Sequence, residues 1–137
     1  MAKPHAHIRL DFTGTCSIGP GKIGLLEAIE RSGSLSAAAR ALGMSYRRAW
    51  LLLHNTNEGF REPVVELSVG GRDGGGTQLT EFGRRVVADY RAFEAAVDAL
   101  AAEAFANLQI SGRGAPEPES RRPVARTLPR RPRSRVR

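Results

Sequence analysis

Cysteine is almost missing from this sequence. The single cysteine, Cys16, excludes an internal disulfide and leaves no CxxC pair that could hold a metal. No apolar run approaches the roughly 18 residues that a membrane span requires. The N-terminal stretch MAKPHAHIRLDF also lacks the apolar core of a signal peptide. We therefore expect a soluble cytoplasmic protein with no membrane partner.

Catalytic constellations are missing as well. The sequence shows no nucleophile with a neighbouring base and no cluster of carboxylates in a cleft-like setting. His5, His7 and Cys16 suggest a metal site, but they are few and flank an expected strand. We expect no enzyme activity, no cofactor and no bound metal.

The net charge of +7 belongs to one end of the chain. Residues 1–110 hold twelve Lys or Arg and twelve Asp or Glu, which cancel, whereas residues 111–137 hold nine Arg and two Glu. Large apolar side chains are also confined to residues 1–110, apart from Val124, Leu128 and Val136. The sequence thus predicts one folded domain, 1–110, and a disordered Arg/Pro-rich tail, 111–137. The tail is either a DNA arm that acts by counterion release or an extension with no selected role.

The pattern of apolar residues over 1–110 predicts short strands around a central set of helices. HIRLDF alternates, with Ile8, Leu10 and Phe12 on one side, and predicts a half-buried strand. Two further strands are expected in PVVELSV and TQLT. Amphipathic helices are expected in KIGLLEAIERSG up to Gly33, in SLSAAARALG, in SYRRAWLLLHNTNEGF and from Thr80 to about Leu108. Their caps are expected at Ser34 or Ser36, at Gly43, at Ser45 and near Gly59.

The long helix at about 80–108 carries a heptad pattern. Its apolar positions from 86 to 104 are spaced by 4, 3, 4, 3 and 4 residues. A helix of this length spans roughly 40 Å at 1.5 Å per residue, more than so small a domain needs for its own core. The pattern favours a dimerisation helix, and the alternative is a helix that folds back over its own domain.

The stretch LSAAARALGMSYRRAWLLL has the pattern of a helix-turn-helix. Such a unit needs a small residue where the helices cross, here Ala39, and a turn residue that tolerates positive φ, here Gly43. It also needs apolar anchors on the second helix, here Ala49 and Leu52 or Leu53. A helical hairpin without a DNA role could share these features.

The start of the second helix favours DNA. Arginine can donate two hydrogen bonds to guanine, and a serine or a free helix N-terminus can bind phosphate. The candidate DNA contacts at the starts of the two helices are Ser34, Ser36, Ser45, Tyr46, Arg47 and Arg48. The alternative for the arginines is a solvated pair. Trp50 could touch DNA, but its position favours packing in the core.

VGGRDGGGTQLT lies between the last two expected strands. It nearly fits the nucleotide-binding pattern G-x-x-x-x-G-K-[ST], but Gly76 occupies the place of the lysine, and TQLT separates the glycines from the next helix. A hairpin tip fits better, because a tip after a helix-turn-helix is the wing of a winged-helix domain. We expect Arg72, Gly74 and Gly75 to contact the DNA backbone there.

The combined pattern resembles a known family. SGSLSAAARALGMSYRRAWLLLHNTNE and VELSVGGRDGGGTQLTEFGRRVVADYR are similar to the N-terminal winged-helix domain of ModE-type molybdate-responsive transcription regulators, over roughly residues 20–107. The resemblance implies a mainly α (α+β) fold, a winged helix-turn-helix with a long C-terminal dimerisation helix. It also implies a homodimer that reads a palindromic operator in double-stranded DNA.

Family members continue into oxyanion-binding domains, which residues 111–137 do not resemble. Effector sensing is therefore expected to need a separate partner, and the alternative is a constitutive regulator. The alternative function is a non-sequence-specific architectural protein that binds nucleic acid through its basic tail.

Overall fold

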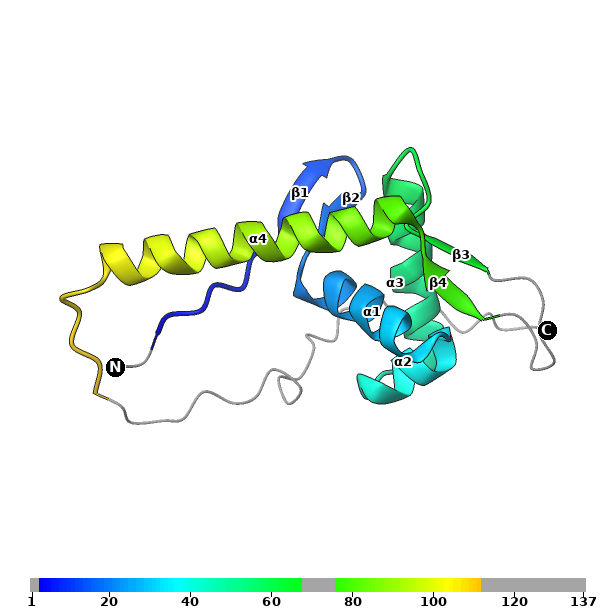
Figure 1. Cartoon of the computed structure of the whole chain (residues 1–137), viewed down its shortest axis with the longest axis horizontal. Coiled ribbons are helices and arrows are strands. Elements are labelled where there is room, and N and C mark those ends of the chain that lie inside the picture. Colours follow the sequence, from blue (N-terminus) through cyan, green and yellow to red (C-terminus); the bar gives the residue numbers. More distant parts are fainter. Residues whose placement is uncertain (1–2, 68–75, 112–137) are drawn as a thin grey trace, which may run out of the picture.

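A long helix runs along one side of the molecule, and three shorter helices pack beneath its N-terminal half (Figure 1). The computed structural model describes residues 3–67 and 76–111, and these form four helices and two β-hairpins. The elements are β1 (Leu10–Thr13), β2 (Cys16–Ile18), α1 (Pro20–Ser32), α2 (Leu35–Ala41), α3 (Tyr46–Gly59), β3 (Val65–Leu67), β4 (Thr77–Leu79) and α4 (Glu81–Ala104). The expected winged helix-turn-helix with a long C-terminal helix is confirmed.

Helix α1 supplies much of the core. It begins with Pro20, whose missing N–H costs nothing in the first turn of a helix. It ends at Gly33, which adopts φ 74° and donates its N–H to Ile29 O at 2.8 Å. Ile23, Leu26 and Ile29 are buried, and α1 packs against α2, α3 and β4. The expected helix and its glycine stop are confirmed.

Helices α2 and α3 form the helix-turn-helix. The Oγ atoms of Ser34 and Ser45 each accept an N–H from the first turn of their helix, both at 3.1 Å. Gly43 turns the chain between the helices with φ 66°. Ala39 is buried. A larger side chain where the two helices cross would hold them apart. Of the two expected caps for α2, Ser34 is the one observed.

Strands β3 and β4 form the stem of the wing. They pair antiparallel, with Val65 opposite Leu79. The Thr77 N–H donates to Gly33 O at 2.8 Å, so the stem is tied to the end of α1. The tip residues expected to contact DNA, Arg72, Gly74 and Gly75, lie outside the described residues.

The N-terminus of α4 lies directly against the segment before β3. Thr80 Oγ accepts the Gly83 N–H at 2.9 Å and donates to Pro63 O at 2.7 Å. The Thr80 N–H donates to Val64 O at 3.0 Å. A Cβ atom on Gly83 would stand only 2.1 Å from Val64 O, so this close approach requires glycine.

The N-terminal hairpin differs from the sequence expectation. The strand begins at Leu10 rather than near His7, Phe12 is exposed, and a second strand, Cys16–Ile18, was not expected. The register shifts between Asp11 and Thr13, and Gly14 turns with φ 53°. The bulge and the glycine break the alternation on which strand prediction depends.

Helix α4 ends at Ala104, four residues before the expected end. Its last turn contains Glu103 and no basic side chain, a charge that is unfavourable at the negative end of a helix. Phe105 leaves the helix with ψ 23°, and the residues that follow are exposed.

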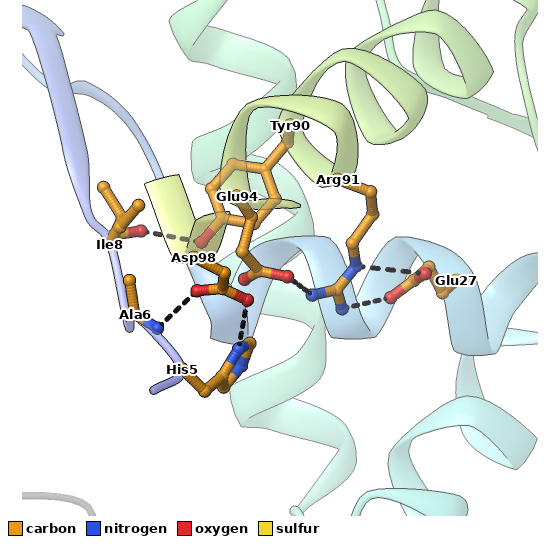
Figure 2. Close-up of polar contacts among 8 residues, drawn as sticks. All are labelled: His5, Ala6, Ile8, Glu27, Tyr90, Arg91, Glu94 and Asp98. Atoms are coloured by element: carbon orange, nitrogen blue, oxygen red, sulfur yellow. Dashed lines mark hydrogen bonds and ion pairs between the residues drawn. The ribbon is translucent and has the colours of Figure 1, made fainter. Parts of the chain in front are cut away.

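The segment before β1 lies along the part of α4 that extends beyond the core (Figures 1 and 2). The buried Tyr90 donates its hydroxyl to Ile8 O at 2.7 Å. Asp98, two turns further on, accepts the Ala6 N–H at 2.7 Å and contacts His5 Nδ1 at 2.8 Å. These contacts fix one side of α4 against its own chain.

Ion pairs attach α4 to α1. Arg91 reaches Glu27 at 2.6 Å and Glu94 at 2.8 Å, as Figure 2 shows. Arg84 pairs with Glu30 at 2.9 Å. The alignment of α4 over α1 is therefore set by charge as well as by apolar packing.

Candidate nucleic-acid interface

Helix α3 has one face in the core and one face in solvent. Ala49 and Thr56 are fully buried, and Leu52 and Leu53 pack against the core from either side. The expected anchors of the second helix, Ala49 with Leu52 and Leu53, are confirmed. Because successive residues are rotated by 100°, Arg47, which lies two positions before Ala49, is turned to the exposed face.

The exposed N-terminal end of α3 is basic. Its first turn reads Tyr46-Arg47-Arg48-Ala49, and the first three of these side chains are exposed. The first backbone N–H groups of a helix and its macrodipole add positive potential at the same end. The fourteen residues of α3 contain one acidic side chain, Glu58, near the opposite end. Positive charge is therefore concentrated at the N-terminus of α3, where it would attract an anionic partner.

The candidate serines occupy the starts of both helices. Ser34 is half-buried at the cap of α2, Ser36 is exposed on the first turn, and Ser45 is exposed at the cap of α3. In a helix cap the serine Oγ accepts a hydrogen bond, and the hydroxyl hydrogen can still be donated to another group. A phosphate oxygen is an acceptor that suits this donor.

Trp50 corrects a sequence interpretation. We expected its ring in the core, but it is 47% exposed and stacks on His54, with ring centroids 4.9 Å apart and planes at 6°. Ala49 and Leu53, four residues apart, occupy the row that faces the core. Trp50 is rotated by 100° from Ala49 and falls outside that row. The four-residue spacing of Trp50 and His54 was the sequence signal that could have revealed the pair.

A strand separates the glycine segment from α4. Thr77–Leu79 forms β4, and α4 starts only after Thr80, whose side chain caps the helix. A phosphate-binding loop needs the helix N-terminus directly at the loop. The arrangement of the described part of the hairpin is that of a wing.

The three groups with a shifted pKa belong to α1 and α4. Burial lowers the pKa of Lys22. The hydrogen bond from Arg91 to Glu27 raises the pKa of the guanidinium. The Ala6 N–H lowers the pKa of Asp98. Since Arg91 and Asp98 belong to the contacts of α4 with its own chain, these shifts reflect folding contacts.

Over the described ranges, 3–67 and 76–111, no helix combines the length and apolarity needed to cross a membrane. Within the same ranges, no three His, Cys, Asp or Glu side chains gather as a metal site would require. The His5 and His7 rings meet edge to face at 4.9 Å, and Cys16 lies on β2.

Comparison with known proteins identifies the domain. Residues 21–84, from α1 to the start of α4, match the family model of the bacterial regulatory helix-turn-helix proteins of the LysR family. The chain carries a LysR-type helix-turn-helix domain. The range of this LysR-type domain includes the capped helices and the stem of the wing.

Two of the three curated relatives described next bear the name ModE. The molybdenum transport protein ModE of Azotobacter vinelandii is 47% identical over 89 residues, which are 65% of this chain and 33% of that protein. The molybdenum-pterin-binding protein MopB of Rhodobacter capsulatus is 44% identical over 66% of this chain and 33% of its own. The DNA-binding transcriptional dual regulator ModE of Escherichia coli K12 is 39% identical over 52% and 27%. The chain spans about a third of the length of these relatives, and the ModE-type resemblance is confirmed.

Proposed function

We propose that this chain is a sequence-specific DNA-binding transcription regulator that acts as a homodimer on a palindromic operator. The observation that carries the proposal is the exposed basic N-terminus of α3, the second helix of a LysR-type helix-turn-helix. In such motifs the second helix lies in the major groove, with its N-terminal residues at the base edges.

Each candidate residue has a physical role in this proposal. Arg47 and Arg48 donate to guanine O6 and N7 or to phosphates. Tyr46 lies beside them with 57% of its surface exposed. Ser34, Ser36 and Ser45 donate their hydroxyls to backbone phosphates. Arg72, Gly74 and Gly75 approach the backbone from the wing, where the absence of side chains on the glycines permits close contact.

Selection of bound sequences from random DNA tests this proposal. We expect a palindrome with half-sites about one helical turn, roughly 34 Å, apart. Replacing Arg47 or Arg48 by Ala should cost about 1–3 kcal/mol of binding free energy if the arginine reads a base. If it contacts a phosphate, the salt slope should fall by about one. Arg61→Ala, at an exposed position beyond the other end of α3, is the matched control. Recovery of no motif would refute the proposal.

An apolar stripe on α4 supports the homodimer. At 100° per residue, six apolar residues of α4 fall within an arc of about 60°. They are Phe82, Val86, Phe93, Val97, Leu100 and Ala104. Phe93 is 43% exposed and Leu100 is 63% exposed. The segment before β1 covers the neighbouring side of α4. Phe82 and Val86 pack against the core of their own chain, whereas Phe93, Leu100 and Ala104 are exposed.

The stripe runs into an apolar hollow of about 330 Å³ between α4 and the β1–β2 hairpin. Phe12, Phe60, Phe82 and Phe93 line the hollow. A second copy of the chain would bury both the stripe and the hollow. Tyr90, which the heptad pattern placed in the seam, is instead buried in its own chain, because its hydroxyl bonds to Ile8.

Solution mass tests the homodimer. Leu100→Glu places a charge in the stripe and should convert the dimer to a monomer at micromolar concentration. Ala102→Glu is the matched control, because Ala102 is exposed and rotated by about 200° from Leu100. Equal masses for both variants and the unaltered chain would refute the role of the stripe.

The basic tail favours a second candidate function, non-specific binding of nucleic acid as an architectural protein. Residues 111–137 carry nine Arg and two Glu and therefore the whole net charge. Removing them should flatten the dependence of affinity on salt and leave sequence preference intact if the regulator proposal is right. Loss of all preference with the tail would favour the architectural function instead.

A regulator of transcription acts where the chromosome is, and the proposal therefore includes a cytoplasmic location. A separate effector-sensing partner stays a prediction. Co-purification with the intact chain is the measurement that checks it.

A further inference from the structure

Three side chains form a row along the exposed side of α3. Tyr46, Trp50 and His54 follow one another at four-residue spacing, so each is rotated by about 40° from the one before. The indole of Trp50 lies parallel to the His54 ring, 4.9 Å away, and 47% of its surface is exposed. The row begins at the basic end of the helix.

The Trp50 indole already stacks on His54 in the chain without a partner. A tryptophan buries about 150–250 Å² when it is covered, so leaving half of it in water forgoes part of a large hydrophobic gain. The core has no place for it, because Ala49 and Thr56 occupy the buried side of α3. Stacking on His54 restricts the indole in advance, which lowers the entropy cost of a later contact.

The charge around the row selects the partner. Arg47 and Arg48 lie beside its first residue, and Glu58 is the single acidic residue of α3. The flat apolar surface of Trp50 therefore lies in a region of positive potential. Such a surface suits a polyanion that presents apolar groups in a groove. In the major groove the thymine C5-methyl is the apolar group of the base pairs, and it distinguishes T·A from the other pairs.

We propose that Trp50 is a specificity-determining residue that packs against a thymine C5-methyl group in the major groove, and that His54 is its positioning residue. This inference rests on the proposed function of α3. The indole supplies the apolar surface, and the parallel His54 ring holds the indole at the exposed side of the helix. Guanine contacts by the arginines and a methyl contact by Trp50 would then read different bases of one half-site.

Replacing thymine by deoxyuridine tests the methyl contact. The DNA is the sequence that the unaltered full chain selects from random DNA, with each thymine replaced in turn by deoxyuridine. Removing one methyl from an apolar contact should weaken binding roughly fourfold at one position of each half-site, from about 0.8 kcal/mol per buried carbon. Trp50→Ala should bind both DNAs equally, and Trp50→Phe should keep part of the discrimination.

The positioning role has its own readout. His54→Ala should reduce the thymine-to-uracil discrimination, and His54→Phe, which keeps a flat ring, should restore it. Asn55→Ala, at an exposed position rotated by 100° from His54, is the matched control and should keep the full discrimination. Restoration by Phe separates stacking from any polar contact of the imidazole.

Fluorescence provides a test without substitution. Trp50 is the one tryptophan of the chain, so the intrinsic tryptophan emission reports on this side chain alone. Acrylamide should quench the free protein readily, and the selected DNA should lower the quenching constant several-fold. An unchanged quenching constant in the complex would overturn the inference even if Trp50→Ala failed to fold.

The outcomes separate this inference from the proposed function. If the unaltered chain selects a motif and Trp50→Ala keeps its thymine-to-uracil ratio, the inference is overturned and the regulator stands. If the unaltered chain selects no motif, both fail. Both are supported if the unaltered chain selects a motif and binds it roughly fourfold more weakly without the methyl group, whereas Trp50→Ala binds the two DNAs equally.

Discussion

Gly83→Ala should destabilise the domain, although alanine is the better helix former. A new Cβ atom would stand 2.1 Å from Val64 O and 2.9 Å from Val64 C. Val64 cannot easily move, since it is fully buried, accepts the Thr80 N–H at 3.0 Å and donates its own N–H to Asn57 at 2.8 Å. The clash is therefore with fixed backbone rather than with a flexible side chain.

The opposing free energies can be compared. Replacing glycine by alanine inside a helix normally gains about 1 kcal/mol. Overpacking costs about 1–3 kcal/mol, and loss of the Thr80–Val64 hydrogen bond costs about 1 kcal/mol more. The net change is a loss of about 1–3 kcal/mol in the free energy of unfolding. At roughly 4–8 °C per kcal/mol for a domain of this size, Tm should fall by about 4–24 °C.

Gly24→Ala is the matched control. Gly24 lies inside α1, and no neighbouring atom comes within 4 Å of the position of its Cβ. This variant should gain about 0.5–1 kcal/mol. Thermal and urea unfolding, followed by far-ultraviolet circular dichroism, measures both variants. A Gly83→Ala domain as stable as the unaltered chain would refute the steric argument.

Three further predictions concern caps and the segment before β1. Ser45→Ala should lose about 1 kcal/mol of stability with its cap, whereas Ser45→Asp should keep the cap and lose DNA affinity by charge repulsion; unfolding and binding titrations distinguish the two. Tyr90→Phe removes the hydrogen bond to Ile8 and should cost about 1 kcal/mol in urea unfolding. The Ala6 N–H and then His5 lower the pKa of Asp98 from its usual 3.8. Its ionised form therefore favours the docked segment above that pH, and docking weakens as the pH falls through the lowered pKa. The Ala6 amide shift should follow this titration, and Asp98→Asn should abolish it.

Local signals along the chain predicted most of the fold. Gly33 and Gly43 end their helices in the left-handed region, as expected from glycine next to a helical pattern. Ser34 and Ser45 cap their helices through hydrogen bonds that span three residues. Such features depend on neighbours in sequence, and a sequence pattern can therefore reveal them.

Features that depend on distant residues were missed. The pairing of β2 with β1 includes a bulge that hides its alternation. Tyr90 fits a heptad seam by its spacing, but its hydroxyl bonds to Ile8, 82 residues away, and this draws the ring into its own chain. Trp50 was expected in the core, but the side of α3 that faces the core carries the smaller Ala49 and Leu53.

The amino-acid sequence by itself determined the helix-turn-helix, the wing stem and the long helix, because capping, turn formation and helical periodicity act over a few residues. The tertiary structure decided which faces of those elements remain open. The segment before β1 docks on Asp98 and Tyr90, while Phe93 and Leu100 on the neighbouring side of α4 stay exposed. Packing of Ala49 against the core turns Trp50 outward. Exposure depends on what the rest of the chain covers, and only the folded arrangement fixes that.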